Sequence, residues 1–307
     1  MWCTRGLCGT GRTTLGGVVR TQRIPRVLSI AGSDSGAGAG IQADLKAFAA
    51  CGVHGMTAIT AITAQNTVGV TAVHPVPPDV ILAQVRAVST DMGIDAVKIG
   101  MLGDRPTIEA VARALDELCE GAPVVLDPVM VAESGAELLD PAARATLIDR
   151  LLPRATVVTP NVPEARSLVP GATELDVAEL ARAIHAMGPD AVVVTGGHRT
   201  EICDVFFDGR RVVELPAPRH PDGAAHGSGC THSSVLAARL AHGDGLLQAA
   251  RAAQVAASRA VAQGLREIGA GPGPVDILGI ASRADEIASA RPPGAPGAPQ
   301  ANTGVLT

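Results

Sequence analysis

The stretch VLSIAGSDSGAGAGIQADLKAFAA, residues 27–50, places a short aliphatic run, a glycine-rich loop and an amphipathic segment one after another. The aliphatic run Val27–Ala31 predicts a buried strand, because strands that are covered on both faces are apolar almost throughout. In the amphipathic segment, Ile41, Leu45 and Phe48 recur at positions i, i+4 and i+7, which predicts a helix with one face toward a core. A strand followed by a loop and a helix begins a βαβ unit.

The same alternation continues along the chain and indicates a parallel sheet. Further aliphatic runs predict strands at Thr57–Ala64, Ala96–Ile99, Val124–Leu126, Thr156–Thr159 and Ala191–Val194. Amphipathic segments predict helices near 38–51, 78–92, 104–119, 141–151, 161–168 and 176–187. Strands that alternate with helices of about 10–15 residues are typical of parallel sheets with helices on both faces.

The pattern changes near residue 200. Cys203–Phe207 and Arg211–Leu215 flank an Asp208-Gly209 pair, which predicts a hairpin with a tight turn. Two helices are then expected near 229–242 and 245–266, with no strand between them. We therefore expect an α/β fold, a three-layer α/β/α sandwich with a mostly parallel central sheet.

Composition excludes several classes of protein. The chain has 307 residues, with 25 Lys+Arg against 30 Asp+Glu and a net charge of −5, and it has only three Phe, one Trp and no Tyr. A mildly acidic chain with few aromatic residues lacks the basic patch and the stacking surfaces that bind nucleic acid. No apolar run approaches the roughly 20 residues of a membrane span. Six scattered cysteines without a CxxC pair favour a reducing, cytoplasmic location.

The two ends of the chain differ in composition from the part between them. Residues 1–25 contain arginine but no acidic residue, and we expect a disordered extension or a start codon assigned too early, with a transit-like leader as a less favoured alternative. No linker interrupts 26–288, so we expect a single domain there. The segment 289–307 is rich in Pro, Gly and Ala and is expected to be a disordered tail.

Glycine-rich or polar segments follow all six of the predicted parallel strands. They are Gly32–Gly40, Gln65–Thr67, Gly100–Gly103, Asp127–Met130, Pro160–Glu164 and Thr195–Gly197. Turn formation explains glycine and proline at these points, but it does not explain a Gln, an Asp and a Glu at the same edge. Ligands of open parallel sheets bind beyond the carboxyl ends of the strands, so we predict the active site there.

The glycine-rich loop itself permits two interpretations. Residues Gly38–Ala43 match the GxGxxA pattern of dinucleotide sites. However, Gly38 follows the predicted strand by about six residues, and Gln65 stands where a ribose-binding acid is expected. We favour a flexible glycine loop that lets the backbone approach a small ligand.

A second glycine-rich segment, His226-Gly227-Ser228-Gly229-Cys230-Thr231, leads directly into a predicted helix. Backbone N–H groups at a helix N-terminus attract an anion. A cysteine at such a position is expected to have a lowered pKa and to act as a base or nucleophile. An ordinary buried cysteine and a Cys–His hydrolase that uses His226 are the alternatives.

Two acidic residues, Asp127 and Glu164, follow neighbouring predicted strands. Paired carboxylates suit Mg²⁺, which prefers oxygen ligands and keeps several waters. Alternatively, Asp127 begins a turn before Pro128, and Glu164 supports the first turn of a helix. An anion site, two acids and a separate pocket loop together suggest phosphoryl transfer.

These residues form a set of motifs that is similar to a known family. The motifs begin at Ala31, Gly38, Thr63, Lys98, Leu126, Thr159, Gly196 and His226 and read AGSD, GAGIQADLK, TAQNT, KIGML, LDPVM, TPNVPEA, GGH and HGSGCT. Across 26–280, the chain resembles the hydroxymethylpyrimidine/phosphomethylpyrimidine kinases of thiamine biosynthesis, which belong to the ribokinase-like superfamily.

The resemblance implies a role for each matching position. Gln65 would hydrogen-bond an aminopyrimidine, and the ring would be surrounded by Gly32, Asp44, Met101 and Val129. Asp127 and Glu164 would hold magnesium and phosphate. The ATP phosphates would lie near Asn161, Thr195, Gly196 and Gly197. The anion hole would consist of Gly227, Ser228 and Gly229, with Cys230 as the catalytic base, a position where many relatives have Asp.

Two positions depart from the family pattern. Thr195 stands where relatives often have Lys, and Ala225 replaces a polar residue that often precedes the His-Gly pair. Neither change removes a chemical group that the reaction needs, but both concern the binding of ATP.

The implied activity is the transfer of phosphate from ATP, with Mg²⁺, to 4-amino-5-hydroxymethyl-2-methylpyrimidine and then to its monophosphate. The alternatives are a pyridoxine or pyridoxal kinase and a non-catalytic pyrimidine sensor. Gln65 favours the aminopyrimidine, because an amide both donates to a ring nitrogen and accepts from an amino group. We expect a small-molecule substrate, no nucleic acid or membrane partner, and a homodimer, as in relatives.

Overall fold

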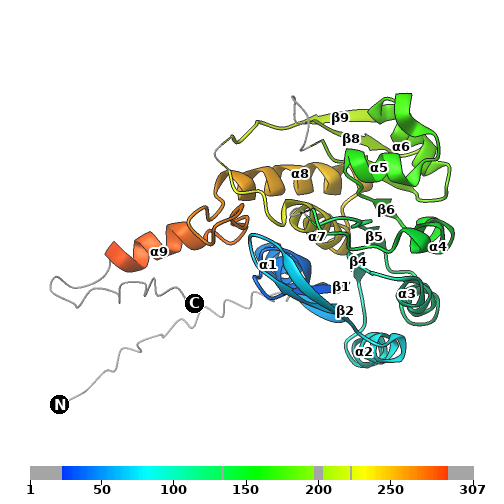
Figure 1. Ribbon diagram of the computed structural model, residues 1–307, viewed down its shortest axis with the longest axis horizontal. Helices are drawn as coiled ribbons and strands as arrows, with labels where there is room; N and C mark the ends of the chain where they lie inside the picture. Colours follow the sequence, from blue (N-terminus) through cyan, green and yellow to red (C-terminus); the bar gives the residue numbers. More distant parts are fainter. Residues whose placement is uncertain (1–22, 133–134, 197–202, 222, 290–307) are drawn as a thin grey trace, which may run out of the picture.

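The computed structural model describes residues 23–132, 135–196, 203–221 and 223–289. Within them, nine strands form one sheet in the order β3-β2-β1-β4-β5-β6-β7-β8-β9 (Figure 1). The strands are β1 Arg26–Asp34, β2 His54–Gln65, β3 Val70–Pro75, β4 Ala96–Ile99, β5 Val124–Leu126, β6 Val157–Val158, β7 Ala191–Val194, β8 Cys203–Phe207 and β9 Val212–Pro216. The neighbours from β2 to β7 pair in parallel, whereas β3, β8 and β9 pair antiparallel.

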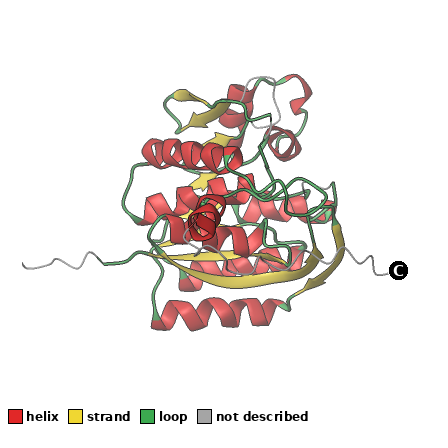
Figure 2. Ribbon diagram, turned by 90° about the vertical axis from the view of Figure 1, so that its left-hand side faces the viewer, coloured by secondary structure: helices red, strands yellow, loops and turns green. Residues whose placement is uncertain are grey.

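Helices cover both faces of this sheet (Figure 2). They are α1 Gly40–Ala50, α2 Pro78–Asp91, α3 Arg105–Leu118, α4 Arg144–Arg150, α5 Val162–Leu168, α6 Val177–His185, α7 Ser228–Ala241, α8 Leu246–Ala262 and α9 Ile280–Ser289. One core lies between the sheet and α2 to α6, and a second core lies between the sheet and α1, α7 and α8. The predicted three-layer α/β/α sandwich is therefore confirmed.

Strand β1 shows why the parallel strands are apolar almost throughout. Leu28 and Ile30 belong to the first core, whereas Val27 belongs to the second. Successive side chains of a strand point to opposite faces, so both sets are buried when helices cover both faces. The predicted hairpin is also confirmed, and the Asp208 carboxylate accepts hydrogen bonds from the backbone N–H groups of Arg210 and Arg211 in its turn.

Two elements were not predicted from the sequence, β3 and α9. Five of the six β3 residues are exposed, so the strand lacks the buried side chains on which the prediction depended. It extends the sheet by antiparallel pairing with β2, which itself runs as far as Gln65. The side chains described in α9 are all exposed as well, so among them α9 has no core-facing stripe.

The predictions for the two ends of the chain concern residues that the structure mostly does not describe. Of the segment 1–25 only Arg23 to Pro25 are described, and of 289–307 only Ser289, which ends α9. These predictions, and that of a single domain over 26–288, stay predictions. Among the described residues, no helix is both long enough and apolar enough to cross a membrane.

Candidate active site

The glycine-rich loop between β1 and α1 is organised by Asp34. Its buried carboxylate accepts hydrogen bonds from the backbone N–H groups of Gly36 (2.8 Å), Gly38 (3.0 Å) and Ala39 (2.8 Å). Burial opposes ionisation, but His226 and these N–H groups outweigh it and lower the pKa of Asp34. The sequence suggested a flexible loop; the structure instead shows a loop whose backbone donors are held by one carboxylate.

The same loop holds the predicted pyrimidine residue Gln65. The Ser35 hydroxyl donates to the Gln65 carbonyl oxygen (2.6 Å), and the Gln65 backbone N–H donates to the Ser35 oxygen (2.9 Å). The Thr63 hydroxyl lies 2.9 Å from the Ser33 carbonyl oxygen and 3.2 Å from the Gln65 Oε1 atom. Gln65 is half-buried at the carboxyl end of β2, so its main chain is fixed and its side chain lies at the predicted edge.

The residues expected around the pyrimidine ring differ in their burial and in their neighbours. Met101 and Gly32 are neighbours, since a Cβ on Gly32 would come within 3.0 Å of the Met101 sulfur. Val129 is half-buried two residues after Asp127. Because residue 32 is a glycine, the Met101 thioether has room beside it, and Gly32 and Met101 form one apolar surface.

Asp44 lies beneath the site and is completely buried. Its carboxylate accepts hydrogen bonds from Ser29 Oγ (2.5 Å), Lys98 Nζ (2.8 Å) and Ser234 Oγ (2.7 Å). Burial alone would lower the pKa of Lys98, but Asp44, Cys230 and Asp127 outweigh it and raise the pKa above its ordinary value. A ligand touches only accessible atoms, so contact between Asp44 and a pyrimidine would require these partners to move.

The predicted anion hole lies at the start of α7. Gly227 has a φ of +82°, and a Cβ there would lie 1.8 Å from the Gly38 carbonyl oxygen. Only glycine fits this close approach of two backbones. Gly229 is exposed with nothing near its Cβ position, so the first turn of α7 is open to a ligand. A helix leaves the N–H groups of its first turn without partners inside the helix, but here the Ser228 N–H donates to the Ala225 carbonyl oxygen (2.9 Å).

Cys230, in the first turn of α7, does not have the lowered pKa that the sequence suggested. Burial raises the pKa of the thiol to about 12, and Asp44 and Asp127 add to this effect, while Lys98 and the Gly40 backbone N–H oppose it. The helix N-terminus alone predicted a thiolate, but two neighbouring carboxylates and the loss of water reverse the sign. Without a bound ligand, Cys230 is therefore a thiol at neutral pH.

We expect the alkylation of Cys230 by iodoacetamide to rise about tenfold per pH unit from pH 7 to 9, because only the thiolate reacts. Peptide mass spectrometry measures the rate at this position, and the Cys230→Ser variant identifies the labelled peptide. A rate that levels off near pH 7 would contradict the raised pKa.

Asp127 and Glu164 lie close together and are both buried. Burial raises the pKa of Asp127, and burial together with the Asp127 charge raises the pKa of Glu164 to about 8. Glu164 also forms the capping box of α5, where its carboxylate accepts from the Asn161 backbone N–H (2.9 Å) and the Asn161 side chain accepts from the Glu164 N–H (2.8 Å). The supporting role in the helix is therefore present in the structure.

This pair of carboxylates fits a magnesium ion. A divalent cation would offset the Asp127 charge that helps to raise the pKa of Glu164, and would favour the ionised form of both carboxylates. The described residues contain no group of three or more His, Cys, Asp or Glu side chains that could hold a metal. Mg²⁺ is ordinarily bound by one or two carboxylates together with substrate phosphates and water, so two carboxylates suffice.

The residues expected near the ATP phosphates form the next part of the edge. Asn161 and Thr195 pair as an isolated parallel bridge, and the Thr195 N–H donates to the Pro160 carbonyl oxygen (2.9 Å). The Gly196 N–H donates to the Asp204 carboxylate (2.9 Å). Gly197 lies outside the described residues.

Comparison with known proteins agrees with this geometry. A model of the family described as phosphomethylpyrimidine kinase matches residues 34–276. The chain belongs to this phosphomethylpyrimidine kinase family. It is 52% identical over 254 residues to the hydroxymethylpyrimidine/phosphomethylpyrimidine kinase of Rhizobium meliloti (strain 1021). The aligned region covers 81% of this chain and 95% of that relative.

Two solved structures show the same fold as this phosphomethylpyrimidine kinase family member. The phosphomethylpyrimidine kinase of Clostridium difficile 630 is 38% identical, with a TM-score of 0.66, over 75% of this chain and 96% of that one. The pyridoxal kinase of Staphylococcus aureus in complex with AMP-PCP and pyridoxal is 33% identical, with a TM-score of 0.74, over 83% of this chain and 94% of that one. The similarity to these two structures confirms the expected ribokinase-like fold.

Several buried polar residues of this phosphomethylpyrimidine kinase family member were not singled out from the sequence. Ser233 donates to Asp127 (2.9 Å) and Ser234 donates to Asp44, so two adjacent serines of α7 hold two different acids. Lys98 stands in a predicted strand and Asp204 in the predicted hairpin. A charged residue within an apolar strand is a signal that could have indicated them, because such residues are rarely buried without a partner.

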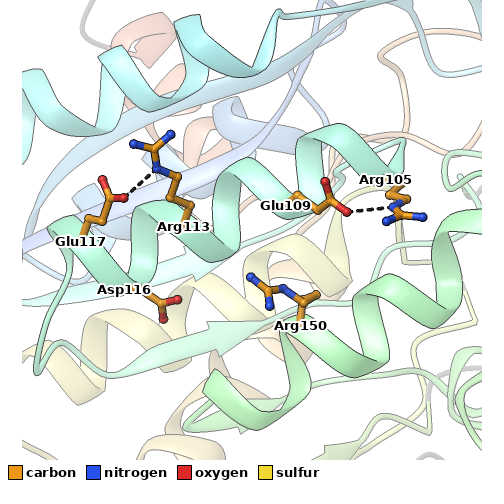
Figure 3. Close-up of a pocket in the computed structure, with 6 residues that line it drawn as sticks. All are labelled: Arg105, Glu109, Arg113, Asp116, Glu117 and Arg150. Carbon is orange, nitrogen blue, oxygen red and sulfur yellow. Dashed lines mark hydrogen bonds and ion pairs between the residues drawn. The ribbon is translucent and has the colours of Figure 1, made fainter.

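A surface hollow of the same protein lies apart from this site, between α3 and α4 (Figure 3). Its lining residues are Arg105, Glu109, Arg113, Asp116, Glu117 and Arg150. Arg105 pairs with Glu109 and Arg113 with Glu117 along the exposed face of α3. Exposed pairs of this kind contribute little to stability, and the hollow contains none of the predicted site residues.

Proposed function

We propose that this chain transfers phosphate from ATP to 4-amino-5-hydroxymethyl-2-methylpyrimidine, and then to the resulting monophosphate, which yields the pyrimidine half of thiamine. The observation that carries the proposal is the arrangement of one edge of the sheet. There, one glycine loop holds Gln65 through Ser35 and contacts the anion hole at Gly227. A ring anchor and a phosphate site that contact the same loop suit the transfer of phosphate to a substituent of the ring.

The nucleotide is proposed as ATP on the strength of the kinase family and of the neighbour that binds AMP-PCP. Asn161, Thr195 and Gly196 are proposed to lie along its phosphates, and so is Gly197. Asp127 and Glu164 would hold Mg²⁺, which supplies positive charge to the phosphates when it is bound. A cytoplasmic location and a homodimer stay predictions.

In the first step, Cys230 is proposed to accept the proton of the hydroxymethyl group while the hydroxymethyl oxygen attacks the γ-phosphorus of ATP and ADP leaves. For this role the resting thiol must first release its own proton to solvent, so that the thiolate accepts the hydroxymethyl proton. Asp127 is one of the groups that raise the pKa of the thiol, so compensation of its charge lowers that pKa. The N–H groups of Gly227, Gly229 and Cys230 are proposed to stabilise the charge of the transferred phosphoryl group, while that of Ser228 donates to the Ala225 carbonyl oxygen.

Pyridoxal is the second candidate substrate, because a neighbour of the same fold binds it. The side chain of Gln65 favours the aminopyrimidine for the reason given above. A pyrimidine sensor without catalysis is disfavoured, because it would not need Asp127, Glu164 and Cys230 around an open helix start.

The test is an assay with ATP and Mg²⁺ that offers hydroxymethylpyrimidine, its monophosphate and pyridoxal in parallel, with the products separated by mass spectrometry. We expect diphosphate from the first two. Product from pyridoxal alone would assign the chain to vitamin B6 salvage, and the lack of any product would support the sensor.

Gln65→Leu is expected to raise the KM for the pyrimidine about tenfold or more, because the variant loses hydrogen bonds to the ring at about 1–2 kcal/mol each. The KM for ATP should stay within about twofold. Steady-state kinetics with each substrate varied in turn measures both. Gln263→Leu, an exposed glutamine after α8, is the matched control. An unchanged pyrimidine KM would remove Gln65 from the pocket.

A further inference from the structure

His226 lies where the glycine loop meets the anion hole. Its ring is buried, and its Nε2 atom is 3.3 Å from the Asp34 Oδ2 atom. A carboxylate with a lowered pKa only accepts hydrogen bonds, so the proton of this contact lies on Nε2. One carboxylate therefore holds both the backbone of the glycine loop and the residue that precedes Gly227.

The backbone of His226 is fixed from the opposite side. Its N–H lies 3.3 Å from the Gly273 carbonyl oxygen, and its carbonyl oxygen accepts from the Val275 N–H (3.1 Å). Its ring packs on Gly38, where an added Cβ would lie 2.1 Å from the ring carbon Cδ2. His226 thus has little freedom to move unless the glycine loop moves with it.

The other end of the same loop fixes the ring anchor. Ser35 follows Asp34 directly and makes two hydrogen bonds to the main chain of Gln65. The Gly271 N–H donates to the Thr67 hydroxyl (3.2 Å), so the segment that carries Gly273 also contacts the chain just after Gln65. Consequently, the dipeptide 34–35 stands between Gln65 and the anion hole.

We propose that Asp34, Ser35 and His226 are positioning residues that fix the separation between the ring anchor Gln65 and the anion hole at 227–230. The proposal rests on the proposed function. The ring and the hydroxymethyl oxygen of the acceptor are separated by a fixed length, so the oxygen meets the phosphorus only if the enzyme holds this separation. A misplacement of about 1 Å can cost about 100-fold in rate.

Substitutions of His226 and of Ser35 should change different kinetic constants. His226→Leu is expected to lower kcat for the first phosphorylation about 100-fold, with the pyrimidine KM within about threefold, because the anion hole shifts while the ring anchor stays. Ser35→Ala should instead raise the pyrimidine KM about tenfold with a smaller loss in kcat.

A conservative variant and a matched control separate positioning from a general loss of structure. His226→Gln keeps an amide donor toward Asp34 and should recover at least tenfold of the kcat lost in His226→Leu. His220→Leu is the control, since His220 is half-buried and is likewise hydrogen-bonded, to Ser258, but lies outside the loop. Its kcat should match that of the unmodified chain.

Hydrogen–deuterium exchange on the chain without substrates tests the coupling independently of activity. In His226→Leu we expect faster exchange in peptides that cover both 34–40 and 226–230, and no change at either in His220→Leu. Faster exchange at 226–230 alone, or an unchanged kcat, would overturn the proposal. If the unmodified chain forms no phosphorylated pyrimidine, the proposed function fails, while the exchange result still decides the coupling. Should His226→Leu not fold, the comparison of His226→Gln with Asp34→Asn replaces it.

Discussion

Cys230→Ala is expected to lower the rate of the first phosphorylation by about 10²–10⁴-fold, the range for loss of a general base, and to lower that of the second much less. The acceptor of the first step is a neutral hydroxymethyl group, whose oxygen must lose a proton as it attacks. The acceptor of the second step is a phosphate oxygen, which is already largely ionised near neutral pH. Proton removal by Cys230 therefore matters mainly for the first acceptor.

Single-turnover assays with each acceptor measure the two steps separately. Cys230→Asp should keep more of the first step than Cys230→Ala, because a carboxylate at this position also accepts a proton. Cys51→Ala is the matched control, since Cys51 is half-buried at the end of α1 and lies outside the proposed site. Equal losses in both steps would refute this division, and would assign Cys230 to the shape of the anion hole.

The pKa of the thiol shows where inference from sequence reached its limit. The motif HGSGCT placed Cys230 at a helix N-terminus, which is correct, and the helix alone predicted a thiolate. The sign of the pKa shift depends first on the burial of the thiol and then on Asp44 and Asp127, which are more than 100 residues away along the chain. Such contacts follow from the topology of the sheet and are not visible in local sequence.

The parallel strands were predictable for the opposite reason. Val192–Val194 and the other central strands are buried on both faces, so every residue in them carries the signal. Strand β3 is exposed, and only its pairing with β2 makes it a strand. Patterns of burial predict elements that are buried, and they fail where an element is held mainly by backbone hydrogen bonds.

The residues of the candidate site also fall into a group that the sequence predicts and a group that it does not. The residues at the ends of the central strands, such as Gln65 and Asp127, follow from the rule that ligands bind at the carboxyl edge. The supporting roles of residues that act through others, such as His226 and Ser234, become evident only from their contacts with Asp34 and Asp44. Their sequence neighbours carry no information about these partners.

Lys98→Met is expected to destabilise the fold by about 3–5 kcal/mol, because it leaves the Asp44 carboxylate buried without its charged partner. Both side chains of this ion pair are fully buried, and the Lys98 Nζ atom lies 2.8 Å from Asp44 Oδ1. Methionine has a similar length and no charge, so the loss of packing is small. Urea unfolding, with the slope m checked for constancy, measures the change in free energy.

The double variant Lys98→Met/Asp44→Asn identifies the cause. It contains neither charge, and its loss of stability should be smaller than that of Lys98→Met alone, because the unpaired carboxylate is the main source of the cost. Lys46 is the other lysine of the chain, half-buried on α1 and bonded to the Ala37 carbonyl oxygen (2.8 Å). Lys46→Met should cost only about 1 kcal/mol, because it leaves no buried charge unpaired. If the double variant were no more stable than Lys98→Met, the packing of the lysine chain rather than the Asp44 charge would hold β4 to α1 and α7.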